Sequence, residues 1–161
     1  MVTLRISTLI AVPLLILAFS ACETGLEPPP PEPEPVGAIQ GTVTYSGNWP
    51  PASQLRQLFF VPLDFKPTSL LEILTEFNQG NLKASEPLTL NVESDTFFVG
   101  DLDNGTYVYN IIANQFGPNL FTDWRPVGVF DENGGVIEIL GDTVQISIHV
   151  DFSNFPPFPP E

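Results

Sequence analysis

The sequence of 161 residues is poor in positive charge, in cysteine and in histidine. It has 5 Lys and Arg residues against 19 Asp and Glu residues, 1 Cys and 1 His, and its formal net charge is −14. Binding to a nucleic-acid backbone requires several basic side chains, so this composition excludes nucleic acid as a partner. A single cysteine also excludes an intrachain disulfide and a zinc site built from several cysteines. Hydrophobic residues make up 43% of the chain, which is enough for one domain with a core.

The first 21 residues have the layout of a secretory signal peptide. Arg5 precedes an apolar stretch over residues 6–19, and two small residues follow at positions 20 and 21. This stretch is shorter than the roughly 20 apolar residues that a membrane-spanning helix needs. We therefore expect a signal peptide over residues 1–21, with a transmembrane anchor as the alternative.

The only cysteine directly follows this segment. Phe19-Ser20-Ala21-Cys22 resembles the lipobox of bacterial lipoproteins, although those proteins usually have Leu, Val or Ile at the position of Phe19. The resemblance implies that Cys22 is acylated and attaches the chain stably to a membrane through more than one acyl chain. Because Glu23 rather than Asp follows, the resemblance implies the outer membrane of a Gram-negative-type bacterium. An ordinary secreted protein cut near Cys22 is the alternative.

Residues 22–35 form a spacer rich in proline and glutamate, with 6 prolines between Pro28 and Pro35. Such a run adopts polyproline II, which rises about 3.1 Å per residue, so the spacer holds the domain up to roughly 40 Å from the bilayer. A docking site for a proline-reading domain is the alternative. Residues 155–161 form a second proline-rich end, which either packs back on the domain through Phe155 and Phe158 or is frayed.

Between residues 36 and 154 apolar and polar residues alternate with a period of two, which is typical of β-strands. The pairs Asn104-Gly105 and Asn133-Gly134 lie between apolar runs, where they favour tight hairpin turns. We therefore predict an all-β fold, a Greek-key β-sandwich of about seven strands. The candidate strands cover residues 39–45, 55–63, 88–92, 97–99, 107–113, 127–130, 136–140 and 144–152.

One segment has the apolar spacing of a helix instead. Ser69 and Glu72 form a capping box, and Gly80 is placed to end the helix. The sequence therefore predicts a short inserted amphipathic helix over about 69–79. Its expected role is to cover one end or edge of the sandwich, and a mobile ligand lid is the alternative.

Three short motifs resemble carboxypeptidase regulatory-like domains, which are transthyretin-like sandwiches common in exported bacterial proteins. They are Ile39-Gln40-Gly41-Thr42-Val43, Gly105-Thr106-Tyr107, and the final run from Thr143 to Ile148. The resemblance covers about residues 36–152; Tyr109, where the family often has a small β-branched residue, and the helix both depart from it. It implies a non-enzymatic accessory or binding module, since the family has no shared catalytic residues.

The candidate binding surface is the long connection after residue 113. It carries Phe116, Phe121, Trp124 and Arg125, and Trp49 lies in another loop. Aromatic side chains beside arginine are common anchors of interfaces, so we expect either a protein partner or a cell-envelope glycan stacked on the two tryptophans. The alternative is that these rings plug an open end of the sandwich.

The inventory of reactive residues does not indicate an enzyme. His149 lies on the polar face of the last strand, where it shares that face with Asp151. The segment from Asp101 to Gly105 departs from the spacing of a calcium loop, and a turn explains it. Since no phosphate-binding loop or dinucleotide fingerprint occurs, we expect no catalytic residue, no metal and no cofactor.

Overall fold

The computed structural model describes residues 35–160, and they belong to one compact unit that spans Glu34–Glu161. The predicted signal peptide, Cys22 and all but the last residue of the spacer lie outside the described residues. The elements follow in the order β1 (Val36–Ser46), η1 (Ala52–Gln54), β2 (Gln57–Leu63), α2 (Leu70–Gln79), β3 (Ser94–Asp103), β4 (Gly105–Tyr107), β5 (Tyr109–Gln115), β6 (Trp124–Val129), η2 (Glu132–Gly135), β7 (Ile137–Ile139) and β8 (Thr143–Asp151).

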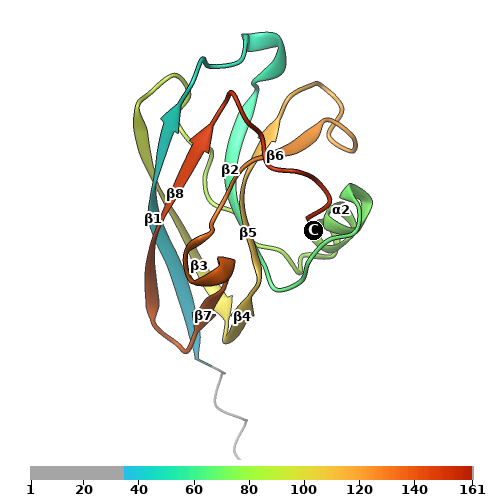
Figure 1. Cartoon of the computed structure of the whole chain (residues 1–161). Coiled ribbons are helices and arrows are strands. Elements are labelled where there is room, and N and C mark those ends of the chain that lie inside the picture. Colours follow the sequence, from blue (N-terminus) through green and yellow to red (C-terminus); the bar gives the residue numbers. More distant parts are fainter. Residues whose placement is uncertain (1–34, 161) are drawn as a thin grey trace, which may run out of the picture. The chain divides into compact units, whose positions relative to one another are not determined.

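Two three-stranded sheets pack face to face (Figure 1). One has the order β3-β1-β8, the other has the order β2-β5-β6, and β4 and β7 form a short separate ribbon. The chain crosses repeatedly between the two large sheets, as it does in a Greek-key sandwich. The predicted all-β sandwich with one inserted helix is confirmed. The described residues contain eight strands, because the run over 107–113 is divided between β4 and β5, which pair with different partners.

The first and last strands lie side by side in one sheet, with β1 in the middle and β8 at an edge. β1 pairs in parallel with β8 and antiparallel with β3. The alternation of the sequence is retained, since Ile146, Ile148 and Val150 of β8 face the core and their neighbours face outward. On β1 the core side includes Ile39 and Val43, both fully buried. The clearest strand of the sequence is therefore an edge strand that pairs with the first strand of the domain.

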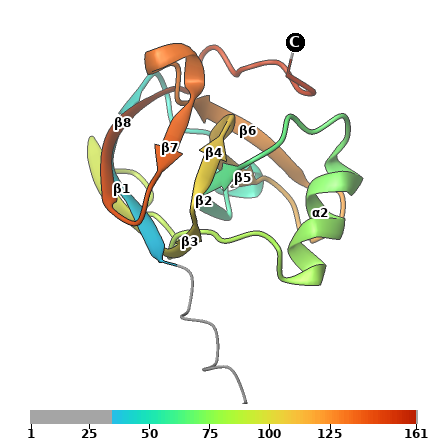
Figure 2. The same ribbon diagram turned by 90° about the horizontal axis from the view of Figure 1, so that it is seen from below.

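The central strand of the second sheet, β5, is buried on both faces along its whole length. On one face Ile112 belongs to the core between the two sheets. On the other face Tyr109, Ile111 and Ala113 belong to a second apolar cluster, which also contains Leu63. Figure 2 shows why, since α2 lies on the far side of this sheet from β1 and β8. The molecule therefore has a third layer, and that layer positions the candidate site.

The predicted helix is present, with the predicted ends. The Ser69 hydroxyl caps α2 by accepting a hydrogen bond from the Glu72 backbone N–H at 3.3 Å. The Glu72 carboxylate accepts a hydrogen bond from the backbone N–H of Thr68, whereas in a standard capping box it would accept from the N–H of the next residue, Ser69. At the other end Gly80 adopts a φ of 80°, and its N–H donates a hydrogen bond to the Phe77 carbonyl at 3.0 Å. No residue of α2 is buried.

The prediction of a strand over 88–92 is wrong. Residues 85–88 instead run irregularly along the outer edge of β2. The Ser85 N–H donates to the Phe60 carbonyl at 2.9 Å, and the Leu88 N–H donates to the Leu58 carbonyl at 2.8 Å. Pro87, between them, has no backbone N–H, so a regular ladder cannot continue. The segment still protects the exposed edge of the sheet.

The two predicted hairpins are also wrong, although both segments do turn. Asn133 and Gly134 adopt the left-handed conformation that the prediction required, with φ of 52° and 71°. They join β6 to β7, however, and these strands pair with different partners. Asn104 likewise joins β3 to β4, which lie in different sheets. Turn residues specify a local reversal of the chain and do not specify which strands pair.

Gly41 should be indispensable to the β1–β8 pairing. A Cβ atom at this position would lie 2.5 Å from the Ile146 carbonyl oxygen and 2.6 Å from the Phe97 ring. We expect Gly41→Ala to lower the free energy of unfolding by about 2 kcal/mol, as overpacking of a core does. Denaturant titration with an unchanged m-value measures the loss.

Gly100→Ala is the matched control. Its Cβ would approach only the ring of Phe98, which is exposed and can turn away. An equal loss of stability in both variants would contradict the role that we assign to the close approach of β1 and β8.

Candidate functional site

The structure separates the two tryptophans of the sequence prediction. The Trp49 ring lies 4.7 Å from the ring of Tyr45 and 4.4 Å from that of Phe152, measured between centroids. It packs against the core between the two sheets, whereas Trp124 packs against the second cluster, outside β5. The two rings therefore do not form a common stacking platform for a glycan.

Arg125 and Phe116 close one end of the sandwich together with the C-terminal segment. The guanidinium carbon of Arg125 lies 4.4 Å from the centroid of the Phe155 ring and 5.3 Å from that of Phe116. Its Nε and Nη2 atoms are buried without a hydrogen-bond partner, and desolvation lowers the pKa of the guanidinium. Both ring contacts are favourable cation–π contacts. For Phe116 and Arg125 this arrangement agrees with the alternative prediction, in which the aromatic side chains fill an open end of the sandwich.

Phe121 and Trp124 lie elsewhere, at a cavity between α2 and the outer face of the β2-β5-β6 sheet. The cavity has a volume of about 380 Å³, which lies within the range of small-molecule sites. Its polar lining residues are Gln57, Asn78 and Arg125. Its other lining residues are apolar: Phe59, Val61, Leu70, Ile73, Leu74, Phe77, Leu82, Ala84, Ile111, Ala113, Leu120, Phe121, Trp124, Pro126 and Phe158.

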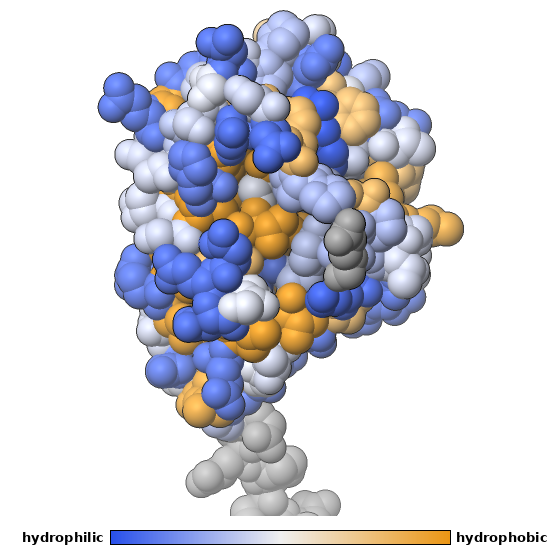
Figure 3. All heavy atoms as spheres, viewed as in Figure 1, coloured by the Kyte–Doolittle hydropathy of each residue, from blue (hydrophilic) through white to orange (hydrophobic). Residues whose placement is uncertain are grey.

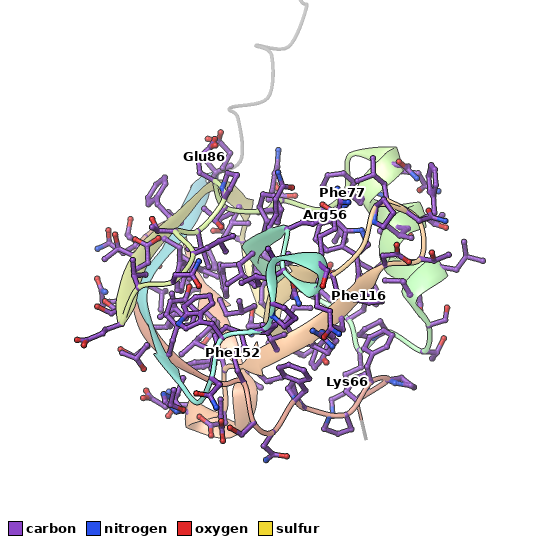
Figure 4. All side chains as sticks on the ribbon, turned by 90° about the horizontal axis from the view of Figure 1, so that it is seen from above. Arg56, Lys66, Phe77, Glu86, Phe116 and Phe152 are labelled. Atoms are coloured by element: carbon purple, nitrogen blue, oxygen red, sulfur yellow. The ribbon has the colours of Figure 1, made fainter. Side chains whose placement is uncertain are left out.

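The floor of this cavity is a sheet face, and its walls are peripheral segments. The floor consists of side chains from β2 and β5, of which Ile111 and Ala113 are buried members of the second cluster. One wall is α2, and Figure 4 shows Phe77 on the side of that helix that faces the sandwich. A second wall is the loop after β5, and a third is the C-terminal segment with Phe158. A ligand would thus rest on a sheet and be enclosed by three peripheral segments.

Hydrogen bonds hold the loop wall in place. The Trp124 Nε1–H donates to the Leu120 carbonyl at 2.9 Å, and the Trp124 ring lies 6.0 Å from that of Phe59. The Asp123 carboxylate accepts from the Asn119 N–H at 2.9 Å, which closes the turn before it. The Phe116 N–H bonds to the Asp123 carbonyl, also at 2.9 Å. Leu120 and Phe121 are thereby held at the cavity although both are exposed.

The helix side of the site was not predicted from the sequence. The helix was expected to cover an end or an edge of the sandwich, whereas Leu70, Ile73 and Leu74 line a cavity over a sheet face. A signal was available, because residues 109–113 have no alternation of polar and apolar side chains. A strand of that kind is buried on both sides, so its outer face requires a cover.

The one histidine of the chain lies on the outer face of the first sheet. His149 accepts or donates two short hydrogen bonds on the outer face of the first sheet, from Nδ1 to the Thr44 hydroxyl at 3.0 Å and from Nε2 to the Ser46 hydroxyl at 2.9 Å. The Asp151 carboxylate bonds to the Ser153 N–H instead of to His149. Thr44 and His149 are both exposed.

Within residues 35–160, no cluster of three or more His, Cys, Asp or Glu side chains could hold a metal ion. No helix in the same range has both the length and the apolar character to cross a membrane.

No family model, no curated protein and no solved structure matches this chain. The resemblances to bacterial lipoproteins and to carboxypeptidase regulatory-like domains therefore rest on the quoted residues alone.

Tyr109, on the same face of β5 as the floor residues Ile111 and Ala113, should make the domain sensitive to alkaline pH. Its hydroxyl is buried without a partner, and burial raises its pKa to about 12. The unfolded chain ionises near pH 10, so Tyr109 contributes stability below pH 10 that is lost as the pH rises through 12. For a pKa shift of this size, the full loss of unfolding free energy is about 2–3 kcal/mol. We expect Tyr109→Phe to reduce the alkaline loss and to leave stability at pH 7 equal or higher.

Denaturant titrations at pH 8, 10 and 11.5 measure both effects. Tyr107→Phe is the control, because the Tyr107 hydroxyl donates to the Asp103 carbonyl at 3.1 Å and its removal should lower stability at pH 8. A Tyr109→Phe variant that is less stable than the parent at pH 8 would contradict the assignment of an unpartnered hydroxyl.

Proposed function

We propose that this chain is a membrane-anchored, non-enzymatic binding module whose ligand is a small, mostly apolar molecule. The observation that carries the proposal is the cavity of about 380 Å³ over the β2-β5-β6 sheet, because its lining is almost entirely apolar. Ligand sites in proteins are concave, largely preformed and lined mainly by such side chains. The aromatic loop residues Phe121 and Trp124 belong to this lining.

The lining favours an acyl chain, an isoprenoid or an apolar ring system over a sugar. A sugar carries many hydroxyl groups, and each needs a hydrogen-bond partner when it is buried. Gln57, Asn78 and Arg125 are too few to supply them. Each methylene group buried in the cavity would contribute about 0.8 kcal/mol, so a chain of moderate length binds well without polar recognition.

Attachment to a membrane through Cys22 is part of the proposal. It is supported by the signal-like segment over residues 1–21 and by the match of residues 19–22 to a lipobox. The outer membrane of a Gram-negative-type bacterium is the proposed location, since Glu23 follows the cysteine. An anchored module of this kind would hold its ligand close to the membrane.

A second candidate function is an interaction or structural module without a small ligand. It is favoured by the exposure of Leu71, Leu120 and Phe121, large apolar side chains that another protein would cover. In that case the cavity would stay empty in the presence of any apolar ligand, which the following experiment tests.

Leu74 and Leu71 provide a matched pair on α2. Leu74 lines the cavity, whereas Leu71 does not and is 72% exposed. We expect the exported chain with Cys22→Ser, which lacks an acyl group, to bind the neutral apolar dye N-phenyl-1-naphthylamine. Leu74→Gln should raise the dissociation constant by about tenfold, because it removes buried apolar area and places an amide in the cavity. Fluorescence titration of the dye measures the constant.

Leu71→Gln should leave dye binding unchanged, since it alters the same helix on its outer side. Ala113→Phe is a second variant, which fills the cavity from its floor without adding a polar group. Dye binding that is absent in the parent, or that is insensitive to both Leu74→Gln and Ala113→Phe, would refute a ligand site in this cavity.

The anchor has its own test. We expect mass spectrometry of the exported protein to show Cys22 as the first residue, carrying acyl groups. Cys22→Ser should release the protein from the membrane fraction. An unmodified Cys22, or a Cys22→Ser chain that stays with the membrane, would count against the anchor.

A further inference from the structure

The outer face of the β3-β1-β8 sheet carries a regular array of side chains, which we call the polar grid. The strand registers align three rows of three residues across the sheet, and the alternation of each strand turns all nine side chains away from the core. Eight of the nine residues are exposed, and Thr42 is half-buried. The rows are Phe98, Gln40 and Gln145; Thr96, Thr42 and Ser147; and Ser94, Thr44 and His149.

The polar grid contains no acidic side chain, no lysine and no arginine, although the domain is strongly acidic. From Val36 to Phe155 the chain has 14 acidic and 4 basic residues, a net charge of −10. At mid-height the left margin of Figure 3, which is the side of β1 in Figure 1, is pale or blue, the colours of intermediate and hydrophilic residues. A surface that meets only water normally mixes charges of both signs. The lack of charge on this face therefore indicates an uncharged partner.

The one acidic residue in the same stretches of the three strands does not belong to the polar grid. Asp95 lies opposite the core residue Val43, on the other face of β3 from the grid. Its carboxylate accepts hydrogen bonds from the N–H groups of Thr89 and Thr96 at 2.6 and 2.8 Å. Its charge is thus directed to the backbone and away from the polar grid.

Hydrogen bonds between side chains hold the polar grid in order. Gln40 Nε2 donates to Gln145 Oε1 at 2.9 Å, and the His149 ring bonds to the hydroxyls of Thr44 and Ser46 at 3.0 and 2.9 Å. The amides and hydroxyls can each make further hydrogen bonds, both as donors and as acceptors. Strands lie about 4.8 Å apart and alternate residues of a strand about 6.7 Å apart, so these groups recur at regular intervals. A ligand with many closely spaced hydroxyl groups would match them.

Phe98 adds an apolar ring to this polar face. It is 58% exposed. Its ring lies over Gly100, since a Cβ atom at that position would be 3.0 Å from one ring carbon and 3.3 Å from another. The ring therefore lies along the strand, whereas most side chains stand perpendicular to a sheet. An aromatic face of this kind attracts the C–H groups of a sugar ring, because the face carries partial negative charge.

A hollow of about 510 Å³ lies over the paired residues Gly41 and Phe97, within the polar grid. Its lining includes five residues of the grid: Gln40, Thr42, Thr96, Phe98 and Gln145. Glu86 is the only charged residue in the lining, and Lys83 lies three residues earlier, so this segment carries one charge of each sign. A carboxylate accepts hydrogen bonds from sugar hydroxyls as an amide oxygen does. The hollow thus suits a polar ligand without net charge.

Other partners fit this face less well. Two copies of the domain would each bring a net charge of −10 and repel each other. The core of a protein interface is usually apolar, whereas the polar grid has a single apolar ring. An anionic polymer would need basic side chains, and the polar grid has none.

We propose that the polar grid binds an uncharged glycan chain, with one sugar ring stacked on Phe98 and neighbouring hydroxyl groups bonded to the amides and hydroxyls of the rows. This site is independent of the apolar cavity, which lies on the outer face of the other sheet. The domain therefore has an apolar site and a polar site on opposite faces of the sandwich. Because hydrogen bonds already order the polar grid, little conformational freedom is lost on binding.

Affinity electrophoresis of the exported Cys22→Ser chain tests the proposal. Native gels contain dextran, laminarin or galactomannan, which are uncharged, or polygalacturonate, which is anionic. We expect at least one of the uncharged polysaccharides to retard the chain, and we expect polygalacturonate not to retard it. Phe98→Ser should raise the dissociation constant, measured from the retardation, by about tenfold because it removes the stacking surface.

Two further variants make the test specific. Phe121→Ser removes a phenylalanine of similar exposure, 67%, from the cavity loop and should leave the retardation unchanged. Gly100→Ala should weaken the retardation several-fold, because the added Cβ atom displaces the Phe98 ring from the strand. The free energy of unfolding of this variant should stay close to that of the parent. Denaturant titration therefore separates loss of the site from loss of the fold.

The absence of retardation by every uncharged polysaccharide, or retardation that Phe98→Ser leaves unchanged, would overturn the proposal. Equal retardation by polygalacturonate would overturn the charge argument and with it the proposal. Sedimentation velocity tests the second copy, since a dimer that Phe98→Ser dissociates would assign this face to self-association in place of a glycan. Uptake of N-phenyl-1-naphthylamine reports on the cavity alone, so a failure at either site is distinguishable from a failure at the other.

Discussion

The burial of β5 on both faces is the constraint on which the rest of the structure depends. Its seven residues are all buried, so the sheet that contains them needs a cover on each side. On the inner side the first sheet supplies that cover and packs densely through residues such as Ile39 and Val43. On the outer side the cover is assembled from α2, one loop and the C-terminal segment. A short helix, a loop and the C-terminal segment do not fill that space as a second sheet would, and a cavity is the result.

The outer cover is held in place chiefly by local interactions. No residue of α2 is buried, and its ends are fixed by Ser69 and Gly80 rather than by a core. Segments with few buried contacts open at low free-energy cost, whereas the floor of the cavity belongs to the stable sheet. This difference suits a binding site, because a ligand can enter by displacing the wall while the floor keeps its shape. The sequence left two roles open for the helix, a cover of the sandwich and a mobile ligand lid. The observed packing is compatible with both roles.

Features determined by neighbouring residues were predictable from the sequence, and features determined by distant ones were not. The helix ends follow from Ser69, Glu72 and Gly80, and strand β8 follows from nine alternating residues. The pairing of β1 with β8 could not be predicted, since about 100 residues separate their partners. The cavity was missed for the same reason, because it combines the helix, the loop and Phe158. Of the predicted binding residues, Phe121, Trp124 and Arg125 line it, while Trp49 and Phe116 pack at the end of the sandwich.

The C-terminal segment has no regular secondary structure, and it contributes both to the closed end of the sandwich and to the wall of the cavity. Phe155 lies on the Arg125 guanidinium at the end of the sandwich, and Phe158 lies at the cavity three residues later. Pro156 and Pro157 stand between them, and proline fixes the φ angle and reduces the conformational freedom that the segment loses on ordering. Each phenylalanine therefore helps to place the other, one through the main core and one through the second cluster. The Arg125 guanidinium contacts the rings of Phe116 and Phe155. These cation–π contacts help to fix the C-terminal segment, which also forms one wall of the cavity.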